Sequence, residues 1–129
     1  MIVCRTPLRV SFLGGGSDLP VHYRLYGGAV VSMAITKYVF VSVNKKFDNG
    51  IRVSYSQTEE VERVGDVKHR LVRAALEKLK IGGGVEITSV ADIPSRGTGL
   101  GSSSAFTVGL LHALHCYKGP YRSKADLAA

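Results

Sequence analysis

The hydrophobic pattern of this 129-residue chain changes its period near residue 66, and that change constrains the fold more than any other feature. Before it, β-branched and apolar residues alternate with polar residues, which is typical of strands that bury one face. After it, apolar residues recur every three or four positions, as on one side of a helix. The sequence therefore predicts an α+β fold, in which helices cover one side of a β-rich sheet.

The first half of the chain is predicted to be a meander of strands. Pro7 lacks an N–H group, so the first strand is expected at an edge of the sheet. Pro20 can open a short helical segment that ends at Gly27 and Gly28. The sequence "DNG" at residues 48–50 is a hairpin signal. The expected strands span residues 2–12, 29–35, 38–47 and 51–56.

The second half is predicted to be mainly helical. Asp66 is the expected N-cap of the first helix there, and Gly82 is its stop signal. We expect the helix after the next strand to be buried, because it is apolar on nearly every face. The expected elements are a helix at 66–80, a strand at 84–90, a helix from 102 to about 117, and a helix that begins at Ser123.

Composition narrows the class of protein. Hydrophobic residues make up 45% and charged residues 21% of the chain, and its length suits one domain over residues 1–129. We find no membrane-length apolar run and no signal-peptide core, so we expect a cytoplasmic protein without a membrane partner. Cys4 and Cys116 lack metal or redox spacing and are expected to be reduced, buried thiols. The net charge of +7 is scattered, which does not favour nucleic acid as the main partner.

A run of three glycines, "FLGGGSDLP", ends the first predicted strand. Three ordered glycines cost conformational entropy, and a plain turn does not require them. Ser17 and Asp18 follow at once. This pattern indicates a place where something other than protein approaches the backbone, with a carboxylate beside it. The structural alternative is that Asp18 forms an Asx-turn or a helix cap before Pro20.

A second glycine-rich stretch, "IPSRGTGLGSSSAF", leads into the helix expected at Ser102. Alternating glycines let the backbone approach phosphate oxygens, and the first helical turn offers N–H groups without partners. Serine hydroxyls can bind phosphate or a magnesium ion. The Walker, dinucleotide and nucleophile-elbow patterns all fail on residue type. The stretch predicts a di- or triphosphate site, with a plain N-cap after a flexible loop as the alternative.

Together, "RTPLRVSFLGGGSD" and "PSRGTGLGSSSA" resemble the motifs of the galactokinase, homoserine kinase, mevalonate kinase and phosphomevalonate kinase (GHMP) superfamily. The "GGGSDLP" version is similar to the branch of sugar kinases that act on D-glycero-D-manno-heptose 7-phosphate. The resemblance implies a fold like domain 2 of ribosomal protein S5, with a left-handed βαβ unit. It also implies transfer of the γ-phosphoryl group of ATP to a hydroxyl of a sugar or sugar phosphate.

The resemblance further implies roles for individual residues. Arg9 matches the arginine that lies near the transferring phosphoryl group, and it is the expected catalytic residue. Ser103 is the expected ligand of Mg²⁺. The expected substrate-binding residues are Gly15, Gly16, Ser17 and Asp18, and the ATP phosphates are expected on Pro94, Gly97, Gly99, Leu100, Gly101, Ser102, Ser103 and Ser104.

Enzymes of this superfamily are longer than this chain, which implies that it is an N-terminal fragment and inactive alone. Their general base, acidic magnesium ligand and third glycine motif lie further downstream. The alternatives are a non-catalytic nucleotide- or sugar-binding fragment and an RNA-binding domain of S5-like fold, and a homo-oligomer is left open. Tyr55 is assigned to strand packing rather than to an adenine clamp, and His69 to the solvated side of its helix. His112 and His115 are interpreted as polar edges of a buried helix rather than as metal ligands.

Overall fold

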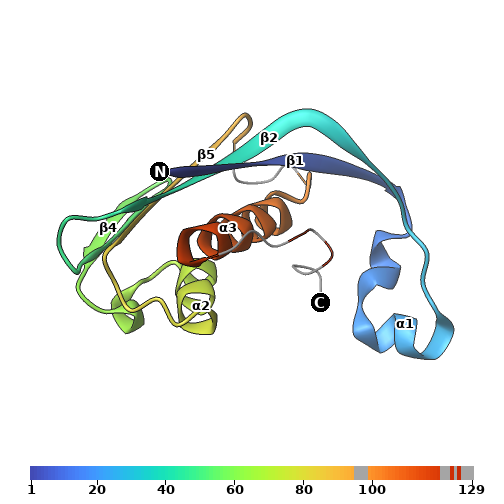
Figure 1. The fold of residues 1–129 in the computed structure, drawn as a ribbon. Coiled ribbons are helices and arrows are strands. Elements are labelled where there is room, and N and C mark those ends of the chain that lie inside the picture. Colours follow the sequence, from blue (N-terminus) through green and yellow to red (C-terminus); the bar gives the residue numbers. More distant parts are fainter. Residues whose placement is uncertain (95–98, 120–122, 124, 126–129) are drawn as a thin grey trace.

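Five strands form one mixed sheet in the computed structural model, which describes residues 1–94, 99–119, 123 and 125. The strands are β1 Ile2–Leu13, β2 Val31–Lys45, β3 Ile51–Ser54, β4 Thr58–Val61 and β5 Val85–Ala91. They lie in the order β1-β2-β5-β3-β4 (Figure 1). β3 and β5 pair in parallel, whereas the other neighbouring strands pair antiparallel.

β1 lies at an edge of the sheet, as the proline at position 7 predicts. Its partner β2 is one long strand, so the prediction of two separate strands there is wrong. The register is irregular between Pro7 and Arg9, opposite the junction of the two predicted strands. Pairing with β1 on both sides of Thr36 and Lys37 keeps β2 continuous, and a local alternation pattern cannot detect such pairing.

The turn at residues 48–50 forms, but it does not join neighbouring strands. Asp48 Oδ1 accepts a hydrogen bond from the Gly50 N–H group at 2.8 Å, which closes the turn. Because β5 lies between β2 and β3, the predicted hairpin and meander are wrong. Turn chemistry shows where the chain reverses and not which strand becomes the neighbour. β4 contains two glutamates in four residues, and so it is too polar to be predicted from its pattern.

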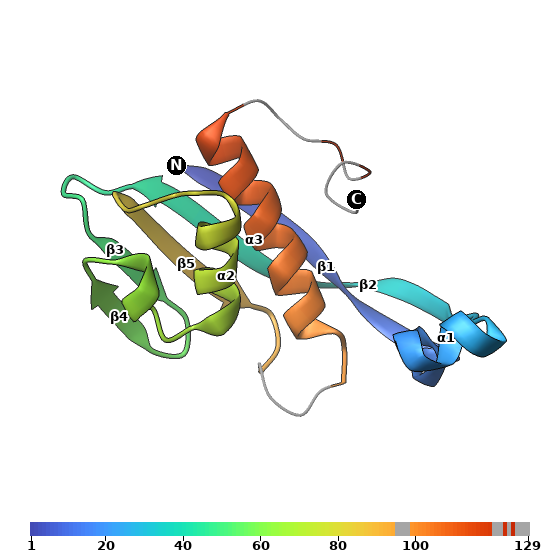
Figure 2. The same cartoon turned by 90° about the horizontal axis from the view of Figure 1, so that it is seen from below.

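Two helices cover one face of the sheet, which confirms the expected α+β arrangement. The helical elements are the short 3₁₀ helices η1 Gly15–Asp18 and η2 Val64–Asp66, and the α-helices α1 Pro20–Tyr26, α2 Arg70–Lys78 and α3 Ser102–Lys118. Figures 1 and 2 show α2 and α3 next to each other on the same face, and they contact each other. The fully buried side chains between helices and sheet include Leu8, Val41, Val43, Ile51, Leu76, Ile87, Leu110 and Leu114.

α2 is shorter than predicted at both ends. Asp66 belongs to η2 and is not the N-cap of α2. His69 is the N-cap instead, and its Nδ1 accepts a hydrogen bond from the Val72 N–H group at 3.4 Å. At the other end the chain leaves the helix at Lys80, which has a φ of 54°, before it reaches Gly82. Propensity favours aspartate as a cap, but a tertiary contact described below fixes the start of α2.

α3 confirms the helix predicted after the second glycine-rich stretch, but only one side of it is buried. Val108 is 50% exposed, so the expectation of burial on nearly every face is wrong. Gly109 lets α3 lie close to β1, because a Cβ there would be 2.7 Å from Thr6 Oγ1. The helix expected from Ser123 lies largely outside the described residues. The buried residues of α3 are Ala105, Phe106, Gly109, Leu110, Ala113 and Leu114.

The end of β1, η1, α1 and the start of β2 form an arm, defined here as residues 11–33. The arm extends beyond the two covering helices (Figure 2). Every residue of α1 is exposed, so this helix contributes nothing to the core. The exposed apolar side chains of the arm include Phe12, Leu13, Leu19, Val21, Leu25, Tyr26, Val31 and Met33.

Both cysteines are free, as expected, but they are half-buried rather than fully buried. Burial, followed by the nearby charge of Cys116, raises the pKa of the Cys4 thiol. Its Sγ lies 3.5 Å from His112 Nδ1. Among the described residues, no group of three or more His, Cys, Asp or Glu side chains could hold a metal ion. None of the helices in this described part is long and apolar enough to cross a membrane.

Candidate functional site

The second glycine-rich stretch brings an uncapped helix start to the surface. Gly101 is the N-cap of α3 in the left-handed conformation, with a φ of 67°, and no side chain in the described part of the chain caps the first turn. The Ala105 N–H group already donates to the Gly101 carbonyl, whereas the N–H groups before it have no capping side chain. An uncapped N-terminus of a long helix attracts anions. Gly97 lies outside the described residues, and Pro94 is exposed near the beginning of the stretch.

Arg9 of β1 lies directly beside this helix start. Its N–H group donates to the Leu100 carbonyl at 3.2 Å. A Cβ added to Gly101 would be 3.1 Å from Arg9 Nε and 3.2 Å from its Cγ. The structure therefore brings together two positions that the sequence singles out separately. It also gives Gly101 two reasons to be glycine, because a side chain there is strained by the positive φ and crowded by Arg9.

An open cleft of about 400 Å³ begins at the first turn of α3. Ser102 and Ser103 line it, whereas Ser104 does not. The rest of the lining comes from β2, β5, the residues after β3 and the start of α2. These other lining residues are Val39, Tyr55, Ser56, His69, Leu71, Ser89, Ala91, Ile93 and Phe106.

Three rings, which we call the aromatic wall, line this cleft: Tyr55, His69 and Phe106. Tyr55 and His69 meet edge to face with 4.7 Å between ring centroids. His69 and Phe106 are 5.2 Å apart. The assignment of His69 to a solvated helix side is wrong, since it caps α2 and lies between two rings. No local pattern predicts the wall, because its members come from three separate parts of the chain.

The carboxylate of Glu59, on β4, supports the aromatic wall from behind. Its Oε1 accepts hydrogen bonds from the Tyr55 hydroxyl at 2.7 Å and the His69 N–H group at 3.1 Å. Its Oε2 accepts one from the Lys68 N–H group at 2.6 Å. Burial acts to raise the pKa of Glu59, but these hydrogen bonds outweigh burial and hold the pKa below its usual value. The hydrogen bond to the Glu59 carboxylate, with burial second, raises the pKa of the Tyr55 hydroxyl.

The three consecutive glycines lie on the arm and have different surroundings. Gly14 has a φ of 85°, and a Cβ there would overlap the carbonyl oxygen of Ala29. Gly15 and Gly16 have no positive φ, and a Cβ on either would meet nothing within 4 Å. The fold itself therefore requires only the first glycine of the run.

Ser17 and Asp18 also differ in whether the fold requires them. The Ser17 hydroxyl can donate to the Gly14 carbonyl at 2.7 Å or the Ala29 carbonyl at 3.1 Å, and it accepts from the Ala29 N–H group at 3.2 Å. It thus closes the loop at the base of the arm. Asp18 makes no hydrogen bond or ion pair with the described residues, and α1 has no side-chain cap. The alternative in which Asp18 caps a helix is therefore wrong.

No hydrogen bond or ion pair among the described residues joins Asp18 to the start of α3. Arg9 connects the two motifs along the chain, because β1 passes the start of α3 and then runs into the arm. The described structure thus places one expected residue, Arg9, at the second glycine-rich stretch. It leaves the carboxylate expected to bind substrate on an exposed arm.

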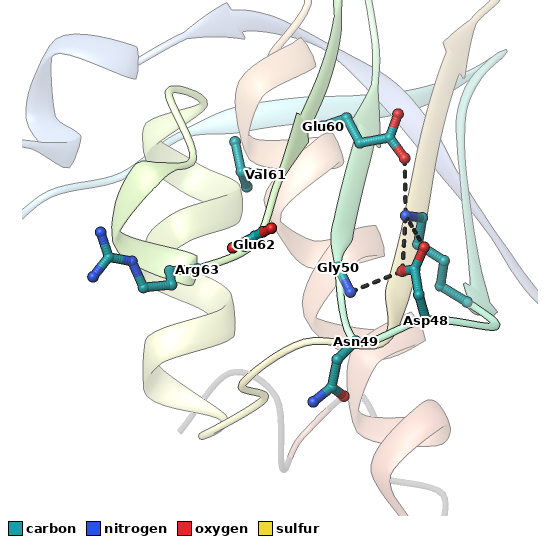
Figure 3. A pocket seen from close by; sticks show the side chains of 8 residues that line it. Asp48, Asn49, Gly50, Glu60, Val61, Glu62 and Arg63 are labelled. Carbon is teal, nitrogen blue, oxygen red and sulfur yellow. Dashed lines mark hydrogen bonds and ion pairs between the residues drawn. The ribbon is translucent and has the colours of Figure 1, made fainter.

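A second, larger hollow of about 680 Å³ lies between the β2–β3 loop and β4 (Figure 3). Lys46 Nζ lies 2.9 Å from Asp48 Oδ1 and 2.8 Å from Glu60 Oε1, and the dashed lines in Figure 3 mark these ion pairs. The pairs raise the pKa of Lys46 and lower those of Asp48 and Glu60. None of the expected site residues lines this hollow, and these charges are already paired, so we assign it no ligand.

The second glycine-rich stretch lies within a part of the chain that matches a known family. The sequence profile described as "GHMP kinases N terminal domain" matches residues 66–129. The fold is similar to that of a mevalonate kinase from Methanococcus jannaschii, with a TM-score of 0.74 and 19% identity over 98% of this chain and 43% of that one. Residues 66–129, just under half of the chain, are thus similar to the N-terminal domain of GHMP kinases.

Two similar proteins are kinases of heptose phosphates. A D-glycero-alpha-D-manno-heptose 7-phosphate kinase of Campylobacter jejuni is 29% identical, over 84% of this chain and 35% of its own length. A D-glycero-D-manno-heptose 1-phosphate kinase from B. thetaiotaomicron has a similar fold, with a TM-score of 0.85 and 20% identity over 99% of this chain and 45% of that one. The chain thus spans less than half the length of each of these relatives.

Proposed function

We propose that this chain is the nucleotide-binding part of a kinase that transfers the γ-phosphoryl group of ATP to a hydroxyl of a sugar or sugar phosphate. The observation that carries the proposal is the uncapped start of α3, with Arg9 beside it and a cleft leading away from it. Phosphoryl transfer relies on positioning and on stabilisation of charge, and these groups can provide both. The names of the two heptose kinases support a sugar phosphate, and a heptose phosphate is the finer proposal.

In this proposal the parts of the nucleotide divide between two surfaces. The phosphates bind the N–H groups and hydroxyls at the first turn of α3, where the helix dipole favours negative charge. The nucleoside occupies the cleft against the aromatic wall. Arg9 faces the phosphoryl group that is transferred and balances its charge.

Ser103 fits the proposed role of magnesium ligand in one respect. Its hydroxyl is an oxygen donor at the rim of the cleft, beside the expected phosphates. Mg²⁺ keeps several waters and binds phosphate oxygens, so a single protein oxygen can be enough. The metal would neutralise charge on the phosphates.

The sugar in this proposal binds on the arm. Gly15 and Gly16 leave space for a ligand to approach the backbone, and Asp18 is free to accept hydrogen bonds from hydroxyls. Further parts of the proposal are the S5-like fold with its left-handed crossover, a cytoplasmic location and the inactivity of residues 1–129 alone. The alternatives are a non-catalytic fragment that binds nucleotide or sugar, and an RNA-binding domain whose affinity would fall steeply with salt.

Calorimetric titration of ATP into this chain tests the nucleotide site. We expect binding in the presence of Mg²⁺, and we expect Ser103→Ala to weaken it about five- to tenfold, as for the loss of one polar contact. Without Mg²⁺ the difference between the variant and the unaltered chain should be smaller, because the Ser103 hydroxyl then contacts phosphate alone. Ser54→Ala, on β3 and outside the cleft, is the matched control. Absence of ATP binding by the unaltered chain would contradict the proposal.

A further inference from the structure

The carboxylate of Glu59 stands behind the cleft and has no role in the function proposed above. Its side chain is buried, with 8% of the residue exposed. The adjacent Glu60 is exposed and pairs with Lys46 on the solvent side. A buried carboxylate is stable in its charged form only when its oxygens are hydrogen-bonded. The partners of Glu59 therefore indicate what this carboxylate does.

Glu59 holds both residues of the edge-to-face contact in the aromatic wall. A single oxygen, Oε1, accepts hydrogen bonds from the Tyr55 hydroxyl and from the backbone N–H group of His69. The other oxygen accepts from the Lys68 N–H group just before the cap of α2. Two separate parts of the chain, the end of β3 and the start of α2, thus meet on one carboxylate.

Through its hydrogen bond to His69, Glu59 also restrains a ring that lines the cleft. Because His69 Nδ1 accepts the Val72 N–H group, the neutral imidazole carries its proton on Nε2. The ring is then fixed at its backbone by Glu59 and at Nδ1 by the first turn of α2. It lies against Phe106, which follows Ser102 by about one turn of α3. Glu59 is thereby connected to the same helix that carries the expected phosphate site.

We propose that Glu59 is a positioning residue of the cleft, which holds the rings of Tyr55 and His69 in the arrangement that receives the planar part of a nucleotide. This inference rests on the proposed function, because it takes the cleft to be a nucleotide site. Glu59 contacts the wall and not the start of α3. It therefore acts on the binding of a nucleotide and not on the binding of a bare polyphosphate.

Glu59→Gln tests the inference, because it keeps the shape and replaces one acceptor oxygen with an amide that itself donates. We expect the affinity of this chain for ATP with Mg²⁺ to fall about three- to tenfold, the range of one favourable aromatic contact. Its affinity for inorganic tripolyphosphate should not change. Glu60→Gln, the same substitution one residue further along β4, should change neither affinity.

A second measurement follows the ring of His69 directly. Nitrogen–proton NMR spectra of histidine side chains report which ring nitrogen carries the proton. The unaltered chain should show His69 protonated on Nε2, whereas Glu59→Gln should show a mixture of tautomers. If Glu59→Gln fails to fold, Tyr55→Phe removes only the hydroxyl that Glu59 holds, and it should weaken ATP and spare tripolyphosphate.

The outcomes separate this inference from the proposed function. If the unaltered chain binds ATP and the folded variant binds it equally well, Glu59 is not a positioning residue and the nucleotide site stands. Equal losses of ATP and tripolyphosphate would also overturn the inference, because they indicate general loosening of the fold. If the unaltered chain does not bind ATP, the proposed function and the inference both fail. Selective loss of ATP together with a changed His69 signal supports the inference.

Discussion

Gly14, Gly15 and Gly16 are chemically identical, but the fold requires only the first. Gly14→Ala should lower the free energy of unfolding by about 1 kcal/mol or more, because its φ is positive and a Cβ would overlap Ala29. Gly16→Ala has open space and should leave stability unchanged or raise it by about 0.4–1 kcal/mol. Chemical denaturation of both variants checks this. A large loss of stability in Gly16→Ala would show that this glycine is structural after all.

We expect Asp18 to contribute to the affinity for substrate and not to the stability of the fold. It makes no hydrogen bond or ion pair with the described residues, so Asp18→Asn should leave the melting temperature unchanged. A charged hydrogen bond is worth about 1.5–3 kcal/mol, so sugar affinity of the complete protein should fall about tenfold or more while ATP affinity holds. Calorimetric titrations with sugar and with ATP measure both effects. A lower melting temperature with unchanged sugar affinity would contradict the proposed role.

Among single residues, the sequence identifies the important ones only where they belong to a short motif. Arg9 and Gly101 were both singled out, and they lie side by side in the structure. Glu59, Tyr55 and His69 could not be found in this way, since their roles depend on contacts between separate parts of the chain. A glutamate in an otherwise polar strand gives no signal of burial until the helix that covers it is placed.

At the scale of single elements, we expect acid to lower the stability of the fold around the start of α2. Glu59 accepts hydrogen bonds from the Lys68 and His69 N–H groups there, and protonation weakens them. The pKa of Glu59 lies below the ordinary value in the folded chain, so the unfolded chain binds a proton first as the pH falls. The stabilisation is present above about pH 4.3, the ordinary glutamate pKa, and is lost as the pH falls through the folded pKa. Urea unfolding between pH 3 and 6, within about the range where carboxyls titrate, should show this loss. Glu59→Gln should flatten it, whereas the exposed control Glu62→Gln should retain it.

The two sides of α3 should differ sharply in their contribution to stability. Leu110 is fully buried, and Leu110→Ala should cost about 2–5 kcal/mol of unfolding free energy. Val108 is half-exposed on the other side, and Val108→Ala should cost about 0.5 kcal/mol or less. Thermal or chemical denaturation distinguishes them. Similar losses at both positions would indicate that α3 is buried all round, as its apolar composition alone predicts.

Elements with a strong local pattern were predicted well, and elements fixed by distant contacts were not. β5 and α3 agree with their predicted ranges to within a residue or so. The hairpin at residues 48–50 was not obtained, because β5 arrives from much later in the chain to separate β2 from β3. The cap of α2 was misplaced because Glu59 sets it and not the propensity of Asp66.

For the whole molecule, the apolar side chains of the arm predict self-association of this chain. Contiguous exposed apolar surface usually marks an interface, and α1 contributes to no core. Leu13 and Leu25 are 71% and 74% exposed. Light scattering should show dimers or larger species at high concentration, and Leu13→Lys with Leu25→Lys should shift them towards monomer. Glu62→Lys, a charge change outside the arm, is the control, and a monomeric unaltered chain would contradict the prediction.

The insertion of β5 between β2 and β3 also sets the order in which the molecule can assemble. β1 with β2, and β3 with β4, are hairpin-like pairs of close neighbours that can form as soon as each has been synthesised. The sheet stays in two halves until residues 85–91 arrive to pair with both. Closure of such long loops carries an entropic cost before any contact compensates it, which slows folding. The facing edges of β2 and β3 are therefore the surfaces that a nascent chain exposes longest.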